Sequence, residues 1–230
     1  MTKITTEDLK SLAEWDTPTI CNALEITNPE RRGYGFSVKP FVCLDPSLPP
    51  IVGFARTVQI RAAQPPSGSN AGNRMPYYEY IGEGELPKVV VIEDIDPQPG
   101  IGAFWGEVNT AFHKGLGTLG VVTNGSIRDL PDSAPNFQAL GGMVNPSHAF
   151  VHPVAFNIPV NVHGMSAEHN DIIHADQHGA VVVPTDAVKR IPNAIDLISR
   201  REAKILAAAR AEGFNIDKLK QAIGDAADIH

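Results

Sequence analysis

The sequence predicts a mixed α/β fold, and three features at the centre of the chain predict it. Residues 88–95, KVVVIEDI, form a run of β-branched residues that is typical of a buried strand. Residues 118–125, TLGVVTNG, are typical of a second buried strand, and the intervening residues 107–117 of a helix that ends in glycine. A strand–helix–strand order favours an α/β sheet. A length of 230 residues fits one domain, 1–230, with helices at its ends.

The N-terminal part is expected to hold two short helices and one strand. Residues 6–14 place apolar side chains at helical spacing after a threonine, and a second helix is expected over 17–24. Residues 28–50 are rich in Pro, Gly and Arg and predict a loop. Residues 51–63 alternate in the way that a strand does.

The C-terminal part is expected to hold short strands and two long helices. Strands are predicted near 150–162, and residues 171–184 indicate a strand, a tight turn and a strand. Residues 186–212 have Ala, Leu, Ile and Arg at helical spacing, and an amphipathic helix follows from about Asp217. The segment 64–74, QPPSGSNAGNR, predicts a mobile loop.

The composition argues against several classes of partner and location. The net charge is −7 and no block of Lys or Arg is present, so no nucleic-acid partner is expected. No run approaches the ~18 apolar residues of a membrane span, and the polar N-terminus lacks the apolar core of a signal peptide, so no membrane association is expected. Cys21 and Cys43 form no CxxC pair and fit a reducing compartment. We therefore expect a cytoplasmic protein.

Residues 104–132 contain the charged side chains that are the strongest candidates for a functional site. Glu107 stands at the start of the predicted helix, whereas Arg128 and Asp129 follow the next strand. Because sites in open α/β sheets form beyond the carboxyl ends of strands, we expect these three residues to meet in space. A plain loop-bracing ion pair between Arg128 and Asp129 is the alternative interpretation, since adjacent charged residues are common.

The types of residue at this position suit the binding of a 2-oxo acid. Asp129 is a hard oxygen ligand for a divalent cation such as Mg²⁺, and the planar fork of Arg128 suits a carboxylate. The helix-start amides of Val108 and Asn109 could bind an anion. A metal on the keto oxygen would act as a Lewis acid and stabilise the enolate that bond cleavage leaves.

The same segment resembles the RraA-like family, which includes 4-hydroxy-4-methyl-2-oxoglutarate aldolases and oxaloacetate decarboxylases. The aldolase branch has an acidic residue, twenty further residues and then Arg-Asp. Here Glu107 is followed by the twenty residues 108–127 and then by Arg128 and Asp129. The sequence NGSIRD departs from the usual DGxxRD at Asn124. Weaker similarities, such as DTPTICNAL and IVGFARTV, extend the resemblance over roughly 10–210.

This resemblance implies a role for each residue of the motif. Asp129 corresponds to the metal ligand, with Mg²⁺ first and Mn²⁺ left open. Arg128 corresponds to the arginine that binds substrate and stabilises the enolate, and Glu107 to the acid that orients a metal-bound water for proton transfer. Gly106, Val108 and Asn109 lie where backbone amides contact the substrate carboxylate.

The resemblance also implies an architecture and an assembly. The family fold is an αββα sandwich of the swivelling-domain type, which forms a homotrimer that is sometimes doubled to a hexamer, with sites between subunits. The terminal helices, within 1–25 and 186–230, are then expected to pack on the core or on neighbouring subunits. Glu202 of the long C-terminal helix would reach a neighbour's site, although an ordinary solvated helix charge is the simpler interpretation.

Two classes of function follow from the resemblance. The first is a metal-dependent lyase that cleaves 4-hydroxy-2-oxo acids or decarboxylates oxaloacetate to give pyruvate. The second is a non-catalytic protein, like RraA itself, that binds and inhibits an RNA-degrading endonuclease. The non-catalytic branch carries glycine at the position of Glu107, so this residue favours the lyase. The distal half of the substrate would be read by the loops 64–76 and 140–152.

Other polar residues support plainer interpretations. His148 and His152, and likewise His174 and His178, are four residues apart, but both pairs lie in strand or loop sequence, which disfavours a zinc site. Some of these histidines could instead line the substrate pocket. Trp105 is expected in the core, and the thiol of Cys21 is expected to be buried and inert.

Overall fold

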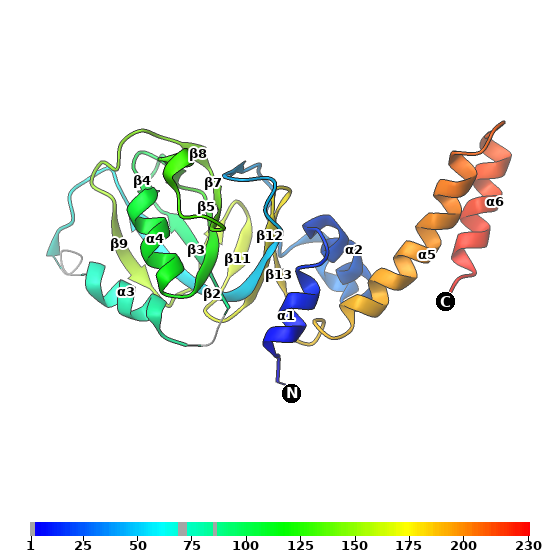
Figure 1. The fold of residues 1–230 in the computed structure, drawn as a ribbon, viewed down its shortest axis with the longest axis horizontal. Coiled ribbons are helices and arrows are strands. Elements are labelled where there is room, and N and C mark those ends of the chain that lie inside the picture. The colour runs from blue at the N-terminus through cyan, green and yellow to red at the C-terminus, as the bar shows by residue number, and fades with distance from the viewer. Residues whose placement is uncertain (1–2, 69–72, 85–86) are drawn as a thin grey trace.

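The computed structural model describes residues 3–68, 73–84 and 87–230. Figure 1 shows a body of strands and helices from which two C-terminal helices project as an arm. The loop predicted over 64–74 therefore lies partly outside the described residues. No helix in the described ranges is both long and apolar enough to cross a membrane.

A mixed sheet forms the centre of the body. Four of its strands, β2, β3, β5 and β7, run parallel to one another. The sheet order is β1 (Val42–Cys43), β7 (Gln138–Gly141), β5 (Thr118–Thr123), β3 (Lys88–Asp94), β2 (Ile51–Arg61), β12 (Ile172–Asp176) and β13 (Gly179–Val183), and β9 (His152–Phe156) also pairs with β2. The buried runs around 88–95 and 118–125 are thus adjacent parallel strands, as their sequences predict.

The two faces of this sheet carry different layers. Along β2, Val52 and Val58 pack among helices on one face, whereas Ile51 and Ala55 pack toward a hairpin on the other. This alternation follows from the two-residue period of a strand. The helices on the first face are α1 (Thr6–Leu12), α2 (Thr17–Thr27), α3 (Arg74–Gly82) and α4 (Glu107–Gly115), and the hairpin consists of β10 (Val160–Val162) and β11 (Met165–Ala167). The mixed α/β class is confirmed.

A small parallel sheet lies beside the main one and positions the candidate site. It joins β4 (Ala103–Trp105), β6 (Ser126–Ile127) and β8 (Met143–Val144). β4 leads directly into α4, and β6 follows β5. The ends of β4 and β6 are therefore neighbours, although about twenty residues separate them along the chain.

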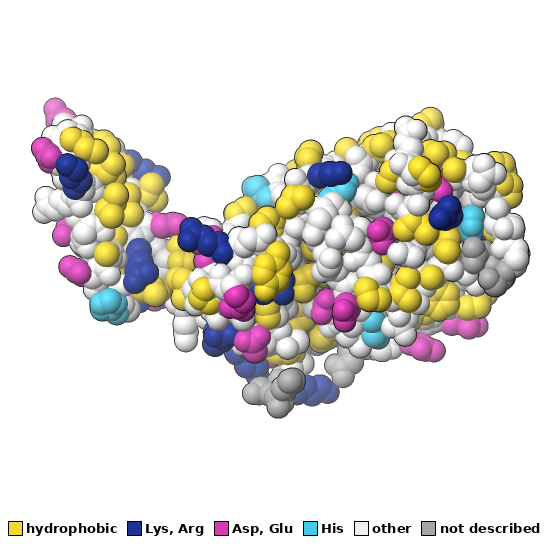
Figure 2. Space-filling model, turned by 180° about the vertical axis from the view of Figure 1, so that it is seen from behind, with side chains coloured by type: hydrophobic (Ala, Val, Ile, Leu, Met, Phe, Trp, Pro, Cys, Tyr) yellow, Lys and Arg dark blue, Asp and Glu magenta, His cyan; other side chains and the backbone are white. Residues whose placement is uncertain are grey.

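The C-terminal helices form the projecting arm in Figure 1. They are α5 (Ile191–Ala209) and α6 (Ile216–Ala227). The long helix was predicted to begin at residue 186, which is wrong, because Pro192 has no N–H to donate and is tolerated only in the first turn. Residues 185–190 form turns instead. Apolar side chains stay exposed along this arm, visible as a yellow stripe in Figure 2, and include Leu206, Ile216 and Ile223.

Candidate active site

The paired ends of β4 and β6 bring together the three charged residues of the motif. The backbone N–H of Arg128 donates to the carbonyl oxygen of Trp105 over 2.8 Å. The backbone nitrogen of Glu107 lies 3.4 Å from Oδ2 of Asp129, and a guanidinium nitrogen of Arg128 lies 3.6 Å from the same oxygen. The structure thus places Glu107, Arg128 and Asp129 side by side, as the strand–helix–strand order predicts.

Gly106 permits this close approach. A Cβ atom at position 106 would lie 2.5 Å from Oδ2 of Asp129 and 3.1 Å from Cγ of Arg128, so a side chain there would displace the motif. Asp129 has a φ of 51°, in the left-handed region that is costly for residues other than glycine. Such strain persists where the surroundings hold it and is frequent at functional sites.

The first turn of α4 presents its backbone amides beside this motif. Gly106 is the N-cap and has no side chain to satisfy those amides. The side chain of Asn109 is already engaged, since its Nδ2 donates to the carbonyl of Phe104 over 2.6 Å and its Oδ1 accepts from the hydroxyl of Tyr78 over 2.9 Å. Asn109 can therefore bind a ligand only through its backbone N–H.

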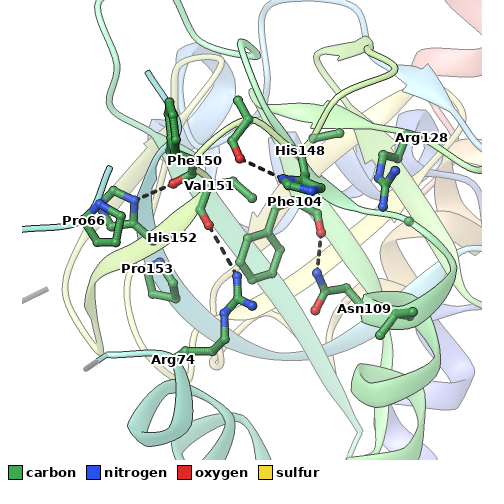
Figure 3. A pocket seen from close by; sticks show the side chains of 14 residues that line it. Pro66, Arg74, Phe104, Asn109, Arg128, His148, Phe150, Val151, His152 and Pro153 are labelled. Atoms are coloured by element: carbon green, nitrogen blue, oxygen red, sulfur yellow. Dashed lines mark hydrogen bonds between the residues drawn. The ribbon is translucent and has the colours of Figure 1, made fainter. Parts of the chain in front are cut away.

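A pocket of about 460 Å³ opens next to these residues, as Figure 3 shows. Its volume lies within the ~300–1,000 Å³ range of small-molecule sites. Gly106, Val108, Asn109 and Arg128 all line it. Glu107 and Asp129 are not among the lining residues and stand next to its Arg128 end.

The rest of the pocket wall is basic and aromatic. Arg74, His148 and His152 line it together with Phe104 and Phe150, and none of the described lining residues is acidic. Arg74 begins α3, and the two histidines lie before and at the start of β9. These positions fall within the loops 64–76 and 140–152, which were expected to contact the distal half of a substrate. The protein as a whole has a net charge of −7, so the basic lining is a local feature that suits an anionic ligand.

The acidic residues of the site suit a hydrated divalent cation. Asp129 offers a carboxylate whose side chain is 34% exposed, and Glu107 lies beside it with its side chain toward solvent. Mg²⁺ is commonly held by one or two carboxylates and several waters, which agrees with this sparse donor set. Within the described ranges, no group of three or more His, Cys, Asp or Glu residues is arranged to hold a metal.

The histidines of the two predicted pairs take up different positions. Nδ1 of His148 bonds to the carbonyl of Ala149, and Nδ1 of His152 to that of Phe150, both over 2.7 Å. His174 is buried, and burial lowers its pKa. Nδ1 of His178 lies within hydrogen-bond distance of Oδ1 of Asp176, at 3.1 Å.

Two hydrogen bonds of the buried His113 connect α4 with Tyr77 of α3. Nδ1 of His113 lies 2.6 Å from the carbonyl oxygen of Asn109, and its Nε2 lies 2.6 Å from the hydroxyl of Tyr77. Because a carbonyl can only accept, Nδ1 carries the proton and Tyr77 donates to Nε2. Burial lowers the pKa of His113 from 6.5 to about 4, so the ring is neutral at physiological pH.

Two further side chains can be compared with the expectations from the sequence. Trp105 is 1% exposed and packs in the core against the rings of His113 and Phe137. The thiol of Cys21, which was expected to be buried, is only partly buried, but burial raises its pKa to about 11, which agrees with an inert thiol.

The sequence did not single out Arg74, Tyr77, Tyr78 or His113, which shape the pocket and its support. Helix α3 was not predicted because residues 74–82, RMPYYEYIG, mix tyrosine and proline and show almost no amphipathic periodicity. The adjacent tyrosines were the one signal available, since a buried tyrosine hydroxyl usually finds a partner.

Comparison with known proteins gives a family. Residues 17–182 match the RraA-like family model, described as Aldolase/RraA. The protein DlpA of Legionella pneumophila is 25% identical over 221 residues, which cover 93% of this chain and 33% of DlpA. The chain thus spans about a third of the length of this curated relative.

Solved structures share the fold at low sequence identity. An uncharacterized protein from Pseudomonas syringae pv. tomato has a TM-score of 0.72 and 23% identity, over 97% of this chain and 96% of that one. RraAS2 of Streptomyces coelicolor, described as an unusual member of the RNase ES inhibitor RraA protein family, has a TM-score of 0.67 and 22% identity, over 91% of this chain and 100% of that one. Since the family model covers most of the chain, the protein belongs to the RraA-like, or Aldolase/RraA, family.

Proposed function

We propose that this protein is a divalent-metal-dependent carbon–carbon lyase that releases pyruvate from 4-hydroxy-2-oxo acids, from oxaloacetate, or from both. The observation that carries the proposal is the convergence of Glu107, Arg128 and Asp129 beside a basic pocket. Lyases and proteins without catalytic activity both occur in this family, so the proposal rests on the site and not on the fold.

The substrate's 2-oxo acid end would bind between Arg128 and the first turn of α4. The guanidinium of Arg128 can hold a carboxylate through two parallel N–H bonds. The amides of Val108 and Asn109 add donors at the positive end of the helix. This arrangement would fix the carboxylate and direct the adjacent keto group toward Asp129.

Asp129 would hold the cation, with Glu107 in reach of its hydration shell. When bound, Mg²⁺ or Mn²⁺ would supply Lewis-acid stabilisation of negative charge on the keto oxygen. Arg128 would stabilise the same developing charge from within the pocket. Glu107 would accept the proton of the substrate's 4-hydroxyl as the C3–C4 bond breaks, the electron pair of that bond would remain on C3 of the pyruvate fragment, and C3 would then take up a proton to give pyruvate.

A non-catalytic binding role, as in the RNase-inhibitor members, is the second candidate. The likeness to RraAS2 favours it, but that likeness is one of fold alone. Glu107 favours the lyase, because the resemblance assigns glycine to the non-catalytic branch at this position.

The proposed assembly is a homotrimer or a homohexamer. Glu202 is exposed on α5, in the arm that projects from the body, whereas α4 and the site lie on the far side of the body in Figure 1. Glu202 could therefore contribute only to the site of another copy, as the resemblance implies.

Two assays run in parallel would decide between the candidates. The first measures pyruvate release from a panel of 4-hydroxy-2-oxo acids and oxaloacetate, and the second measures inhibition of an RNase E-type endonuclease. The proposal expects pyruvate release from at least one acid, and a loss of that release in Glu107→Gly. Inhibition of the nuclease together with no pyruvate release would favour the second candidate.

A further inference from the structure

The first turn of α4 must keep a fixed orientation if the amides of Val108 and Asn109 are to bind a carboxylate. A polar N-cap side chain usually fixes such a turn, but the N-cap of α4 is Gly106, which has no side chain. We propose that Tyr78 of α3 is a positioning residue that fixes the side chain of Asn109 and, through it, the two amides. The inference rests on the proposed function for the assignment of the substrate's carboxylate to these amides.

The side chain of Asn109 is engaged at both of its polar ends. Its Nδ2 donates to the carbonyl of Phe104 over 2.6 Å, as Figure 3 shows, and its Oδ1 accepts from the hydroxyl of Tyr78 over 2.9 Å. Because a backbone carbonyl can only accept, the nitrogen must face Phe104 and the oxygen must face Tyr78. The hydroxyl of Tyr78 is therefore the donor, and the side-chain amide of Asn109 has a single orientation.

The backbone carbonyl of Asn109 is connected to α3 as well. Nδ1 of His113 donates to this carbonyl over 2.6 Å, and the hydroxyl of Tyr77 donates to Nε2 of the same ring over 2.6 Å. Two adjacent tyrosines of α3 thus reach the side chain and the main chain of Asn109. Because its side chain and its carbonyl are both bonded, the peptide groups around Asn109 cannot turn without breaking these bonds.

The ring of Tyr78 is packed independently of its hydroxyl group. Its centroid lies 5.9 Å from that of Phe112 and 5.8 Å from that of His113, in edge-to-face arrangements with both. Phenylalanine at this position would keep these contacts and remove only the bond to Asn109. Tyr78 is not among the described residues that line the pocket of about 460 Å³, so the substitution leaves the pocket wall unchanged.

Binding of pyruvate in the presence of Mg²⁺, measured by calorimetry, tests this role without turnover. The variant is Tyr78→Phe, and the matched control is Tyr80→Phe on the same helix. The hydroxyl of Tyr80 accepts from the backbone N–H of Thr57 over 3.0 Å and bonds to Nδ1 of His169 over 2.8 Å, outside the described lining of this pocket. Both variants therefore lose the bonds of one tyrosine hydroxyl, and thermal unfolding compares the effects on stability.

We expect Tyr78→Phe to bind pyruvate roughly 2- to 10-fold more weakly than the wild type, the range for loss of one hydrogen bond between neutral groups. In steady-state pyruvate release, KM should rise by the same factor and kcat should change little, because the carboxylate is bound equally in the substrate and in the transition state. Tyr80→Phe should keep the affinity of the wild type for pyruvate even if its Tm falls.

Asn109→Ala provides a second test, because it removes the group through which Tyr78 acts. It should weaken pyruvate binding at least as much as Tyr78→Phe does, and the double variant should show no further loss. Additive losses, wild-type affinity in Tyr78→Phe, an equal loss in Tyr80→Phe, or a wild type that does not bind pyruvate would overturn the positioning role. Weakened pyruvate binding in Tyr78→Phe, without pyruvate release by the wild type from any 4-hydroxy-2-oxo acid or oxaloacetate, would instead overturn the lyase proposal and leave the positioning role intact.

Discussion

At the level of single residues, the candidate site depends on a close contact between the backbone at Gly106 and the side chains of Arg128 and Asp129. Gly106 lets the side chains of Arg128 and Asp129 approach the start of α4, and Asp129 adopts a left-handed conformation there. Arg128 and Asp129 are each about one third exposed, so their mutual ion pair contributes little stability. We therefore propose that the pair serves ligand binding, and the prediction for Arg128 below tests this role.

Substitution of Arg128 by lysine should be far from conservative. Lysine keeps the charge but lacks the planar fork that can hold a carboxylate with two bonds. Pyruvate release should fall by ~10²–10³ in turnover, the range for loss of one well-placed electrostatic stabiliser. Steady-state kinetics would measure this loss, with Arg32→Lys, on the surface away from the pocket, as the matched control. Unchanged turnover in Arg128→Lys would remove Arg128 from the reaction.

Glu107 should affect two reactions unequally. Retro-aldol cleavage needs a base for the hydroxyl proton, whereas decarboxylation of oxaloacetate has no such proton to remove. Glu107→Ala should reduce aldol cleavage by roughly 10²–10⁴, the range for general base catalysis, and should reduce decarboxylation much less. Both rates should be measured on the same purified and correctly assembled variant. Equal losses would leave Glu107 as a structural or metal-shell residue and not a base.

His113 should make the protein sensitive to acid. Its pKa is lowered from 6.5 to about 4, so its contribution to stability is complete above pH 6.5 and is lost as the pH falls from 6.5 toward 4. The full loss is on the order of 3 kcal/mol for a shift of this size. Denaturant titrations across this range should show a weaker dependence on pH in His113→Gln, with the residual part due to groups such as His174. An identical dependence in both proteins would contradict the assignment.

At the level of elements, the sequence predicted the strands and helices whose residue pattern follows from burial or helical spacing alone. The runs in β3 and β5 are buried on both sides, and this burial favours near-continuous runs of apolar residues such as Val, Ile and Leu. Helix α4 was expected because residues 107–117 are typical of a helix that ends in glycine. The resulting strand–helix–strand unit predicted that Glu107 lies close to Arg128 and Asp129. The small β4–β6–β8 sheet was missed, since strands of two or three residues are too short to show a period.

The loops 64–76 and 140–152 were expected to contact the distal half of the substrate, but the individual residues of that pocket wall could not be predicted, for a related reason. Arg74, His148 and His152 come together only through tertiary packing of α3 and the segment that leads into β9. Nothing in their sequence spacing relates α3 to β9. The start of α5 was misplaced because the apolar spacing continues through 186–190, while Pro192 decides where the helix begins.

At the level of the whole molecule, the projecting arm is the feature that a single chain leaves unexplained. Leu206, Ile216 and Ile223 are each at least 43% exposed on α5 and α6. Exposed apolar surface on an isolated pair of helices commonly marks a contact between subunits. Together with the assembly that the family resemblance implies, this surface leads us to propose a homotrimer or a homohexamer in solution.

Light scattering at micromolar concentration would determine this mass. Ile216→Asp combined with Ile223→Asp should shift the protein toward smaller species and reduce activity, if neighbouring copies complete one another's sites. Lys220→Gln, which changes an exposed polar residue of the same helix, serves as the matched control and should keep the mass of the wild type. A monomeric wild type with full activity would exclude the proposed assembly.

The proposed reaction requires a divalent cation, so the dependence of pyruvate release on such a cation tests the proposal most directly. The enzyme would be treated with EDTA, freed of the chelator, and assayed with a 4-hydroxy-2-oxo acid before and after addition of Mg²⁺ or Mn²⁺. Because one or two carboxylates and water bind such ions weakly, activity should be lost on chelation and restored by either ion, and Asp129→Ala should not recover. Full activity after exhaustive chelation would contradict the metal-dependent mechanism.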